Sequence, residues 1–506
     1  MSVLFTNVLV WAPAQPSAMV GPTDLLVDGD VIAAIGEQAR GLAPADVRTV
    51  DGAGHHVLVP GLVNAHFHSP ANHLKGAFRS RPLETFMLYE SPADPALTPT
   101  PREAYLRTML GALEMLRTGT TSVQDDAFLM PTPDPEIIDA VMQAYADSGI
   151  RASVALDQPE LPDADKLPFL AGADEGFAQA LNTPAPAAAP ELLAAYDHLV
   201  GNWHGSHGGR LTAAVSISAP QRVSPEYFAA LDDLSRRHDL PLFAHFLETR
   251  VQRALSVPGT GQERFAGRSL VRYTADLGLL SERVNVIHAV WVDDDDLDLI
   301  ADAGAVVAHN PVSNLRLGSG VMPFRAMRER GIPIALGVDE AICDDTVNTW
   351  GVVKAAGLVH NVSGLDAEDW PSTTEVLEAL WEGGAAAMRQ TGRVGRVAVG
   401  AQADLLLLDL HAPAFTPFND LRGQLVYCEN GGSVAMTLVA GHVVAEAGRV
   451  VSVDETELLA EARELHAARL PALQRTWAAA DALLPAYDAV VRRAARTDVG
   501  MNRWIA

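Results

Sequence analysis

The chain has 506 residues and a formal net charge of −26 at pH 7, with 63 Asp and Glu against 37 Lys and Arg. This acidity argues against nucleic acid as a partner. No run of about 18 apolar residues predicts a membrane span, and the N-terminus lacks the pattern of an export signal. With only Cys343 and Cys428, a disulfide framework or a thiolate zinc site is not expected. We therefore expect a cytoplasmic protein with one large domain plus additions.

The two ends of the chain share a β-rich pattern. Residues 3–51 contain short alternating strands separated by turn signals, and residues 395–450 look alike. Such flanks can pair with each other. We therefore predict one small β-sandwich domain, built from residues 1–58 and 396–450.

The middle of the chain alternates β-prone runs with helical patterns, which is typical of βα units. The helical stretches include residues 102–117, 135–148, 225–238 and 294–303, the last beginning in the acidic run Asp293 to Asp296. Eight such strands predict an α/β fold, a parallel (β/α)8 TIM-type barrel over residues 59–395. A doubly wound sheet is the alternative, but no Gly-x-Gly-x-x-Gly motif follows an early strand. Residues 451–506 are expected to form closing helices. The eight predicted strands are residues 57–65, 120–124, 152–156, 211–217, 241–246, 284–288, 305–309 and 332–338.

A proline- and alanine-rich segment, residues 159–190, follows the third predicted strand. Its composition predicts a long loop. It leaves the barrel on the side where such folds keep their active sites. A segment that covers the pocket and a passive surface excursion both fit the pattern.

Two histidines end the first barrel strand. His66 and His68 are spaced i and i+2, so their side chains share one face of a strand and can provide half of a metal site. In a parallel barrel, the carboxyl ends of all strands meet at one mouth. Further ionisable residues stand at such ends, namely His245, His288, His309 and Asp339.

Three imidazoles and a carboxylate suit one divalent metal, Zn²⁺ first and Fe²⁺ second, with a position left for water. Such a metal lowers the pKa of bound water towards neutrality. Glu248, three residues past His245, is placed to take up the water proton and deliver it to a departing nitrogen.

These residues together resemble the amidohydrolase superfamily, in its mononuclear deaminase and chlorohydrolase branch, which contains triazine hydrolases, guanine and cytosine deaminases and adenosylhomocysteine-type deaminases. The resemblance implies that His66, His68, His245 and Asp339 bind the metal and that Glu248 is the proton shuttle. It implies that His288 orients the water or polarises the substrate, and that Asp339 helps deprotonate the water. A homodimer is a family expectation. The matching pieces are residues 60–68, 245–249, His288, residues 308–320, 336–339 and 400–405.

Three features bear on the site's details. Binuclear relatives carry a lysine at the end of strand four, but residues 214–219 contain none, so a single metal is expected. Many deaminases of this branch have Pro-His after that strand, whereas Pro220-Gln221 here argues against adenosylhomocysteine-type specificity. The acidic residues 340–348 suit a polar or cationic substrate group, or a capped helix start. Candidate apolar walls are Leu74, Phe86, Tyr89, Trp291 and Trp350.

We therefore predict a metal-dependent hydrolase that acts on a small molecule and cleaves a C–N bond at an sp2 carbon. The leading hypothesis is deamination of an amino-substituted N-heterocycle by metal-supplied hydroxide. The alternative keeps the site but changes the bond to an acyclic amide, urea, carbamate or carbon–halogen bond. A non-catalytic scaffold on the same fold is a third reading, disfavoured because no expected site residue is missing.

Overall fold

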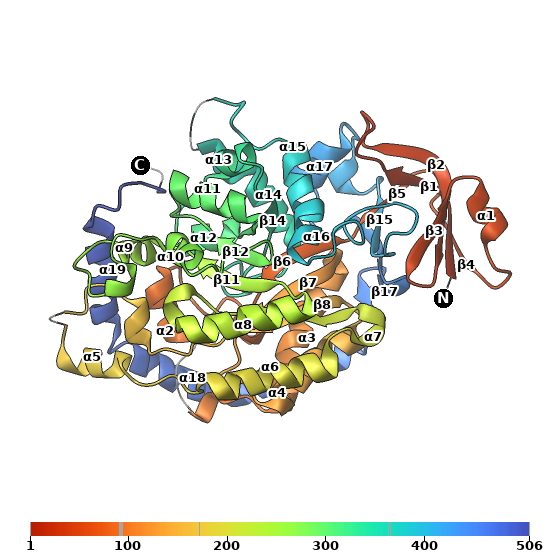
Figure 1. The fold of residues 1–506 in the computed structure, drawn as a ribbon. Coiled ribbons are helices and arrows are strands. Elements are labelled where there is room, and N and C mark those ends of the chain that lie inside the picture. Colours follow the sequence, from red (N-terminus) through yellow and green to blue (C-terminus); the bar gives the residue numbers. More distant parts are fainter. Residues whose placement is uncertain (1, 91–94, 172, 363, 365, 505–506) are drawn as a thin grey trace.

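A computed structural model of the chain describes residues 2–90, 95–171, 173–362, 364 and 366–504 (Figure 1). Its centre is a parallel barrel of eight strands, as predicted. The fourth strand is bent into two pieces, β9 and β10, between which the Ala214 amide donates to the Val154 carbonyl (2.7 Å). The strands are β6 (Leu62–Phe67), β7 (Thr120–Ala127), β8 (Arg151–Leu156), β9 (Leu211–Ala213), β10 (Val215–Ser216), β11 (Leu242–Phe246), β12 (Val284–His288), β13 (Val306–His309) and β14 (Ile334–Leu336).

Backbone hydrogen bonds join the last strand to the first. Beyond β14, the Asp339 amide donates to the His66 carbonyl (2.9 Å), and the His68 amide donates to the Asp339 carbonyl (3.0 Å). This exchange closes the barrel at its carboxyl end. It also fixes three predicted site residues side by side before any side-chain contact is considered.

The closure depends on a glycine. A Cβ atom on Gly337 would lie 2.3 Å from Asn310 Oδ1 and 2.8 Å from His66 Cβ. Distances this short exceed what a packed interior tolerates. Only glycine therefore lets the segment after β14 approach β6 closely enough for the two backbones to pair.

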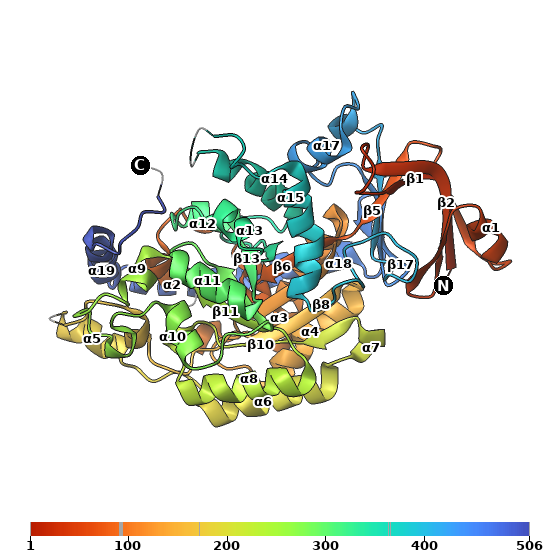
Figure 2. The same cartoon turned by 45° about the horizontal axis from the view of Figure 1, so that its top comes forward.

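Both ends of the chain contribute to one nine-stranded sheet, which lies at one end of the molecule (Figures 1 and 2). Its two halves share a core in which Phe5 and Leu25 from the N-terminal end pack with Leu407 and Met436 from the C-terminal end. Both ends of the chain thus build one β-rich unit, as expected, and its strands are hydrogen-bonded into a single sheet, here called the sandwich sheet. Its strands are β1 (Ser2–Trp11), β2 (Met19–Asp28), β3 (Val31–Ile35), β4 (Arg48–Asp51), β5 (His56–Pro60), β15 (Leu405–Asp409), β16 (Val434–Val439), β17 (His442–Glu446) and β18 (Arg449–Val450).

The predicted continuous strand over residues 57–65 is wrong. The chain passes from β5 in the sandwich sheet to β6 in the barrel at Gly61. A Cβ atom on Gly61 would lie 2.1 Å from Thr121 Oγ1, so the crossing needs glycine. An uninterrupted apolar run conceals this change of sheet because both pieces are fully buried.

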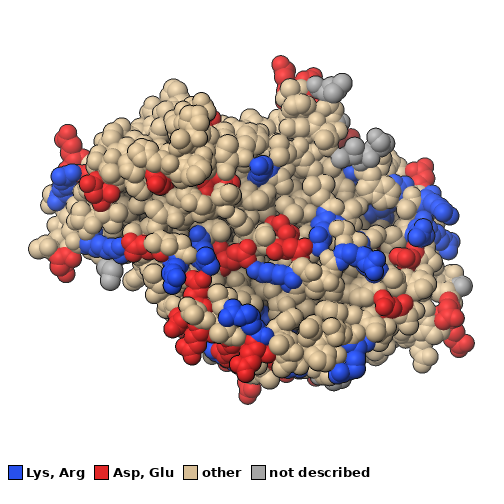
Figure 3. All heavy atoms as spheres, turned by 180° about the vertical axis from the view of Figure 1, so that it is seen from behind, with Lys and Arg blue, Asp and Glu red and all other residues tan. Residues whose placement is uncertain are grey.

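Helices cover the barrel, and α11 begins as its sequence predicts, with the Asp293 side chain accepting from the Asp296 amide. None of the helices in the described residues is both long and apolar enough to cross a bilayer. On the face in Figure 3, acidic and basic side chains are interspersed around large uncharged areas. The longer helices are α2 (Leu83–Glu90), α3 (Pro101–Thr118), α4 (Pro135–Ser148), α6 (Ala189–Trp203), α8 (Pro225–His238), α11 (Asp294–Ala303), α14 (Thr349–Val359), α18 (Glu455–Ala480) and α19 (Leu484–Arg496).

A buried ion pair ties the barrel to the sandwich sheet. The Arg151 guanidinium at the start of β8 contacts both Asp404 oxygens (2.7 and 3.1 Å), and the two side chains are 3% and 2% exposed. The Ala440 amide also donates to Asp404 (2.7 Å). A paired charge of this kind is costly to break, because the remaining partner stays buried.

We predict that Arg151→Met lowers the free energy of unfolding by about 3–5 kcal/mol, measured by urea denaturation, because Asp404 is left buried without its cation. Arg330→Met is the control. Arg330 pairs with Asp294 and Asp298, whose side chains are 85% and 65% exposed, so its loss should cost less than about 1 kcal/mol. Equal losses in the two variants would contradict this account.

We also predict that Gly337→Ala lowers the free energy of unfolding by about 1–3 kcal/mol through overpacking against His66. Gly351→Ala is its control, since Gly351 lies on the exposed face of α14 with open space around its Cβ position. That change should be neutral or stabilising by up to about 1 kcal/mol. A Gly337→Ala protein as stable as the wild type would show that the close approach is not required.

Candidate active site

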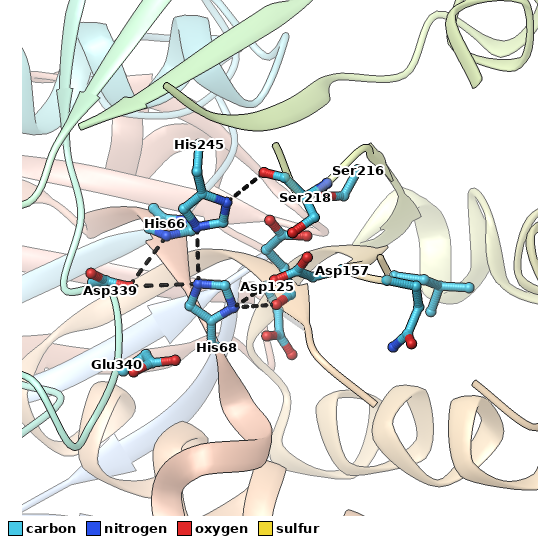
Figure 4. Close-up of polar contacts among 12 residues, drawn as sticks. His66, His68, Asp125, Asp157, Ser216, Ser218, His245, Asp339 and Glu340 are labelled. Carbon is cyan, nitrogen blue, oxygen red and sulfur yellow. Dashed lines mark hydrogen bonds and ion pairs between the residues drawn. The ribbon is translucent and has the colours of Figure 1, made fainter. Parts of the chain in front are cut away.

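The imidazoles of His66, His68 and His245 converge at the carboxyl end of the barrel (Figure 4). The Nε2 atoms of His68 and His245 lie 3.3 Å apart. Asp339 Oδ1 lies 3.3 Å from His66 Nε2 and 3.5 Å from His68 Nε2. Four predicted ligand side chains, at or just beyond the ends of β6, β11 and β14, therefore lie close together.

The outer nitrogens of two of these rings are held by main-chain carbonyls. His68 Nδ1 lies 2.5 Å from the Asp126 carbonyl oxygen, and His245 Nδ1 lies 2.7 Å from that of Ser218. A ring that donates from Nδ1 turns the lone pair of Nε2 inward, which is how metal-binding histidines are commonly oriented. Two Nε2 lone pairs facing each other at 3.3 Å are unfavourable unless a cation lies between them.

The spacings between these nitrogen and oxygen atoms can be compared with those around a bound metal. Bonds of about 2.0–2.1 Å in tetrahedral geometry place ligand atoms roughly 3.3–3.4 Å apart, close to the spacings observed here. His66 Nε2 is buried, and its 3.3 Å contact with Asp339 Oδ1 does not have the geometry of a hydrogen bond. The donor set therefore fits one divalent metal.

The protonation of the site follows from burial and from Asp339. Burial lowers the pKa of His66 and of His245, which favours the neutral imidazoles that a metal requires. Burial opposes protonation of His68 as well, but neighbouring carboxylates, Asp339 foremost, raise its pKa. Although burial acts in the other direction, the imidazoles hold the pKa of Asp339 well below its usual range, so it is ionised. Ser313 Oγ also donates to Asp339 Oδ2 (2.5 Å).

Glu248 and His288 form a second pair beside these ligands. Glu248 Oε2 lies 3.5 Å from His288 Nε2, and the other oxygen, Oε1, is buried and unpartnered within the described part of the chain. Burial, and then the nearby Asp339, raise the pKa of Glu248 well above its ordinary value. Burial lowers the pKa of His288 to about 4, so this ring is neutral at physiological pH.

The orientation of His288 depends on an unusual backbone. Its neighbour Ile287 packs inside the barrel with Ala308, so regular alternation would turn His288 outward. A φ of +72° instead redirects the ring towards Glu248. Nδ1 lies 3.0 Å from Asn314 Oδ1, to which it can donate, and 3.2 Å from Asn310 Nδ2, so the two carboxamides bracket this side of the ring.

His309, at the end of β13, takes no part in the cluster. Because Ala308 points inward, His309 points outward, and its Nε2 lies 3.1 Å from His360 Nε2. Both His309 and His288 end a strand in sequence. The backbone conformation at each strand end decides that His288 faces the site and that His309 packs outside it.

The sequence pattern did not predict two buried carboxyl groups that lie behind His68. Asp126 and Asp157 form with His68 a group whose ligand atoms lie within 4.8 Å of one another. Both oxygens of Asp126 are buried and unpartnered among the described residues. Burial, and then the Asp157 charge, raise the pKa of Asp126 well above its usual value. Their only sequence signal is an Asp at the end of the second and of the third strand.

A small pocket of about 80 Å³ opens onto the ligands. Glu90, Asp157 and Glu340 line it, and of the acidic residues 340–348 only Glu340 does so. Gln221 also lines it, with its Oε1 buried and unpartnered in the described chain. The expected walls Leu74, Phe86, Tyr89, Trp291 and Trp350 do not border this pocket; its apolar walls are Leu83, Met87, Phe128 and Leu317.

Comparison with known proteins identifies the family. The model of the amidohydrolase family matches residues 57–444. A 5-methylthioadenosine/S-adenosylhomocysteine deaminase of Nitratidesulfovibrio vulgaris (strain Miyazaki F) is 34% identical over 443 residues, covering 87% of this chain and 91% of the relative. A 5'-deoxyadenosine deaminase of Methanosarcina mazei is 30% identical over 417 residues, covering 82% and 87%.

Solved structures agree with the fold. A zinc-bound adenosine deaminase from Xanthomonas campestris superposes with a TM-score of 0.78 at 26% identity, covering 93% of this chain and 98% of that one. A zinc complex of an atrazine chlorohydrolase mutant from Arthrobacter aurescens gives 0.78 at 23% identity, covering 92% and 100%. The chain therefore belongs to the amidohydrolase family, as a metal-dependent hydrolase of carbon–nitrogen bonds.

Proposed function

We propose that this hydrolase deaminates an adenosine-derived nucleoside and binds a single zinc ion through His66, His68, His245 and Asp339. The observation that carries the proposal is the convergence of three Nε2 atoms and one carboxylate at the spacing of metal ligands. Two named relatives are deaminases of adenosine-derived nucleosides, and one solved neighbour holds zinc. The homodimer and the cytoplasmic location stay predictions from the sequence.

The metal and Glu248 have different roles in the proposed reaction. When bound, the metal supplies Lewis acidity that lowers the pKa of water towards neutrality. Glu248 accepts the proton of that water and passes it to the departing amino nitrogen. Its raised pKa suits it to both steps, because a proton carrier works best when its pKa lies near the working pH.

His288 has a positioning and polarising role in this proposal. It is neutral at physiological pH and is clamped by Asn310 and Asn314, so its Nε2 keeps a fixed place between Glu248 and Asp339 (3.5 and 3.9 Å). Asp339 stays ionised and receives the Ser313 hydroxyl hydrogen bond. Ionised, it can both bind the metal and help draw a proton from the water.

Gln221 bears on which adenosine derivative is the substrate. The pocket presents a carboxamide where many deaminases of the branch have histidine, and its free Oε1 can accept a hydrogen bond from the substrate. We therefore favour 5'-deoxyadenosine and 5'-methylthioadenosine over S-adenosylhomocysteine. Release of ammonia from these three compounds by metal-loaded protein tests that order.

We predict that Glu248→Gln reduces kcat by roughly 10²–10⁴-fold while the metal content stays unchanged, because only the proton transfer is lost. The readouts are ammonia release and elemental analysis of the same preparation. Glu226→Gln, on the exposed face of α8, is the matched control and should leave both unchanged. Full activity in Glu248→Gln would rule out its role as proton shuttle.

A further inference from the structure

A larger cavity, here called the side chamber, adjoins the metal pocket. It has a volume of about 640 Å³, whereas the metal pocket has about 80 Å³. Ligand-binding pockets usually enclose roughly 300–1,000 Å³, so the metal pocket alone is too small for an ordinary ligand. The two spaces adjoin, because five residues line both: Glu84, Met87, Phe128, Lys166 and Arg222.

The side chamber is walled by three separate parts of the chain. They are α2, the proline- and alanine-rich segment with α5 (Glu175–Leu181), and the helices α18 and α19. Of these, α2, α5 and α19 lie at the end of the molecule opposite the sandwich sheet (Figures 1 and 2). The rings of Phe177 and Tyr487 pack edge to face at 5.2 Å and join α5 to α19. The proline- and alanine-rich segment is therefore a wall of the chamber and not a passive surface excursion.

Apolar side chains dominate these walls, among them Met87, Leu88, Met130, Leu181 and Leu483. The helices α18 and α19 lie beyond residues 57–444, the region that matches the family. The shape of the chamber is thus determined partly by segments outside the common catalytic unit.

Charged side chains at the junction between the two spaces already contact other groups of the protein, although Arg222 Nε is buried and unpartnered among the described residues. Lys166 Nζ lies 2.9 Å from Asp163 Oδ1, and the Arg222 charge also acts on that carboxylate. Arg222 Nη1 donates to Ser218 Oγ (2.7 Å), and Glu84 accepts from the Thr249 hydroxyl (2.5 Å). Lys166 and Arg222 thus share the charge of Asp163, and burial raises the pKa of Glu84, which favours its uncharged form. A charged substituent would have to disrupt the Lys166–Asp163 pair, whereas an uncharged one would not.

We propose that the side chamber binds an uncharged, largely apolar substituent of the substrate, several carbon atoms long, while the amino-heterocycle occupies the metal pocket. This inference rests on the proposed function, since it assigns the part of the substrate that does not react. Burial of each further methylene in the chamber then favours longer substituents.

The test compares 5'-deoxyadenosine, 5'-methylthioadenosine, 5'-hexylthioadenosine and a 5'-(5-carboxypentyl)thio analogue on the metal-loaded enzyme. We expect kcat/KM for the hexylthio compound to exceed that for 5'-deoxyadenosine by roughly tenfold or more. The carboxylate at the end of a chain of similar length should abolish the gain. A kcat/KM that ignores the substituent, or that favours the carboxylate, would overturn the proposal.

Substitutions in the chamber walls then show whether the substituent binds in the side chamber. Ala480→Phe narrows the chamber from α18, and Ala180→Phe narrows it from α5 on the facing segment, where the alanine is exposed and a larger side chain is tolerated. Each should remove most of the advantage in kcat/KM that the hexylthio compound has over 5'-deoxyadenosine. Ala478→Phe, on the exposed face of α18 outside the chamber, is the matched control and should change neither.

Calorimetric binding of the same compounds separates this inference from the proposed function. If no nucleoside is deaminated, but the hexylthio compound binds more tightly than 5'-deoxyadenosine and Ala480→Phe removes the difference, the chamber inference stands and the proposed function fails. If nucleosides are deaminated but neither turnover nor binding depends on the substituent, the chamber inference fails and the function stands.

Discussion

The backbone pairing between His66, His68 and Asp339 is the constraint on which the site depends. Two hydrogen bonds, of 2.9 and 3.0 Å, join the first strand of the barrel to the segment after the last. They close the barrel and place three of the four proposed ligands together by main-chain geometry alone. Gly337 makes this approach possible, because any side chain there would collide with His66. His245 then completes the set from the far side of the barrel mouth.

Hydrogen bonds from neighbouring groups hold the proposed ligand side chains in place around this backbone pairing. Carbonyl oxygens of Asp126 and Ser218 orient two imidazoles, and the Ser313 hydroxyl holds Asp339. Preorganisation of this kind matters because groups aimed at a reacting centre need not reorganise during the reaction. The same burial raises the pKa of Glu248 and lowers that of His288, so a proton carrier and a neutral imidazole stand side by side.

Much of this arrangement could be predicted from the sequence, because strand ends in a parallel barrel share one mouth. The i, i+2 spacing of His66 and His68, and the positions of His245 and Asp339, suffice to place them there. Other features could not be predicted. His288 reaches the site only through a φ of +72°, and His309, which looks equivalent in sequence, packs against a histidine 51 residues away. The change of sheet at Gly61 was hidden because the strands on both sides of it are buried. Asp126 and Asp157 stand at or just beyond the ends of β7 and β8 and lie close to His68, but their sequence carries no motif that marks them as site residues.

The most direct test of the central claim is the position of metal in crystals of the zinc-loaded protein, located by anomalous scattering. The account predicts one zinc ion, at about 2.0–2.2 Å from the Nε2 atoms of His66, His68 and His245 and from an oxygen of Asp339. Zinc bound instead among His68, Asp126 and Asp157, a second ion of equal occupancy, or no ion at the three imidazoles would contradict it.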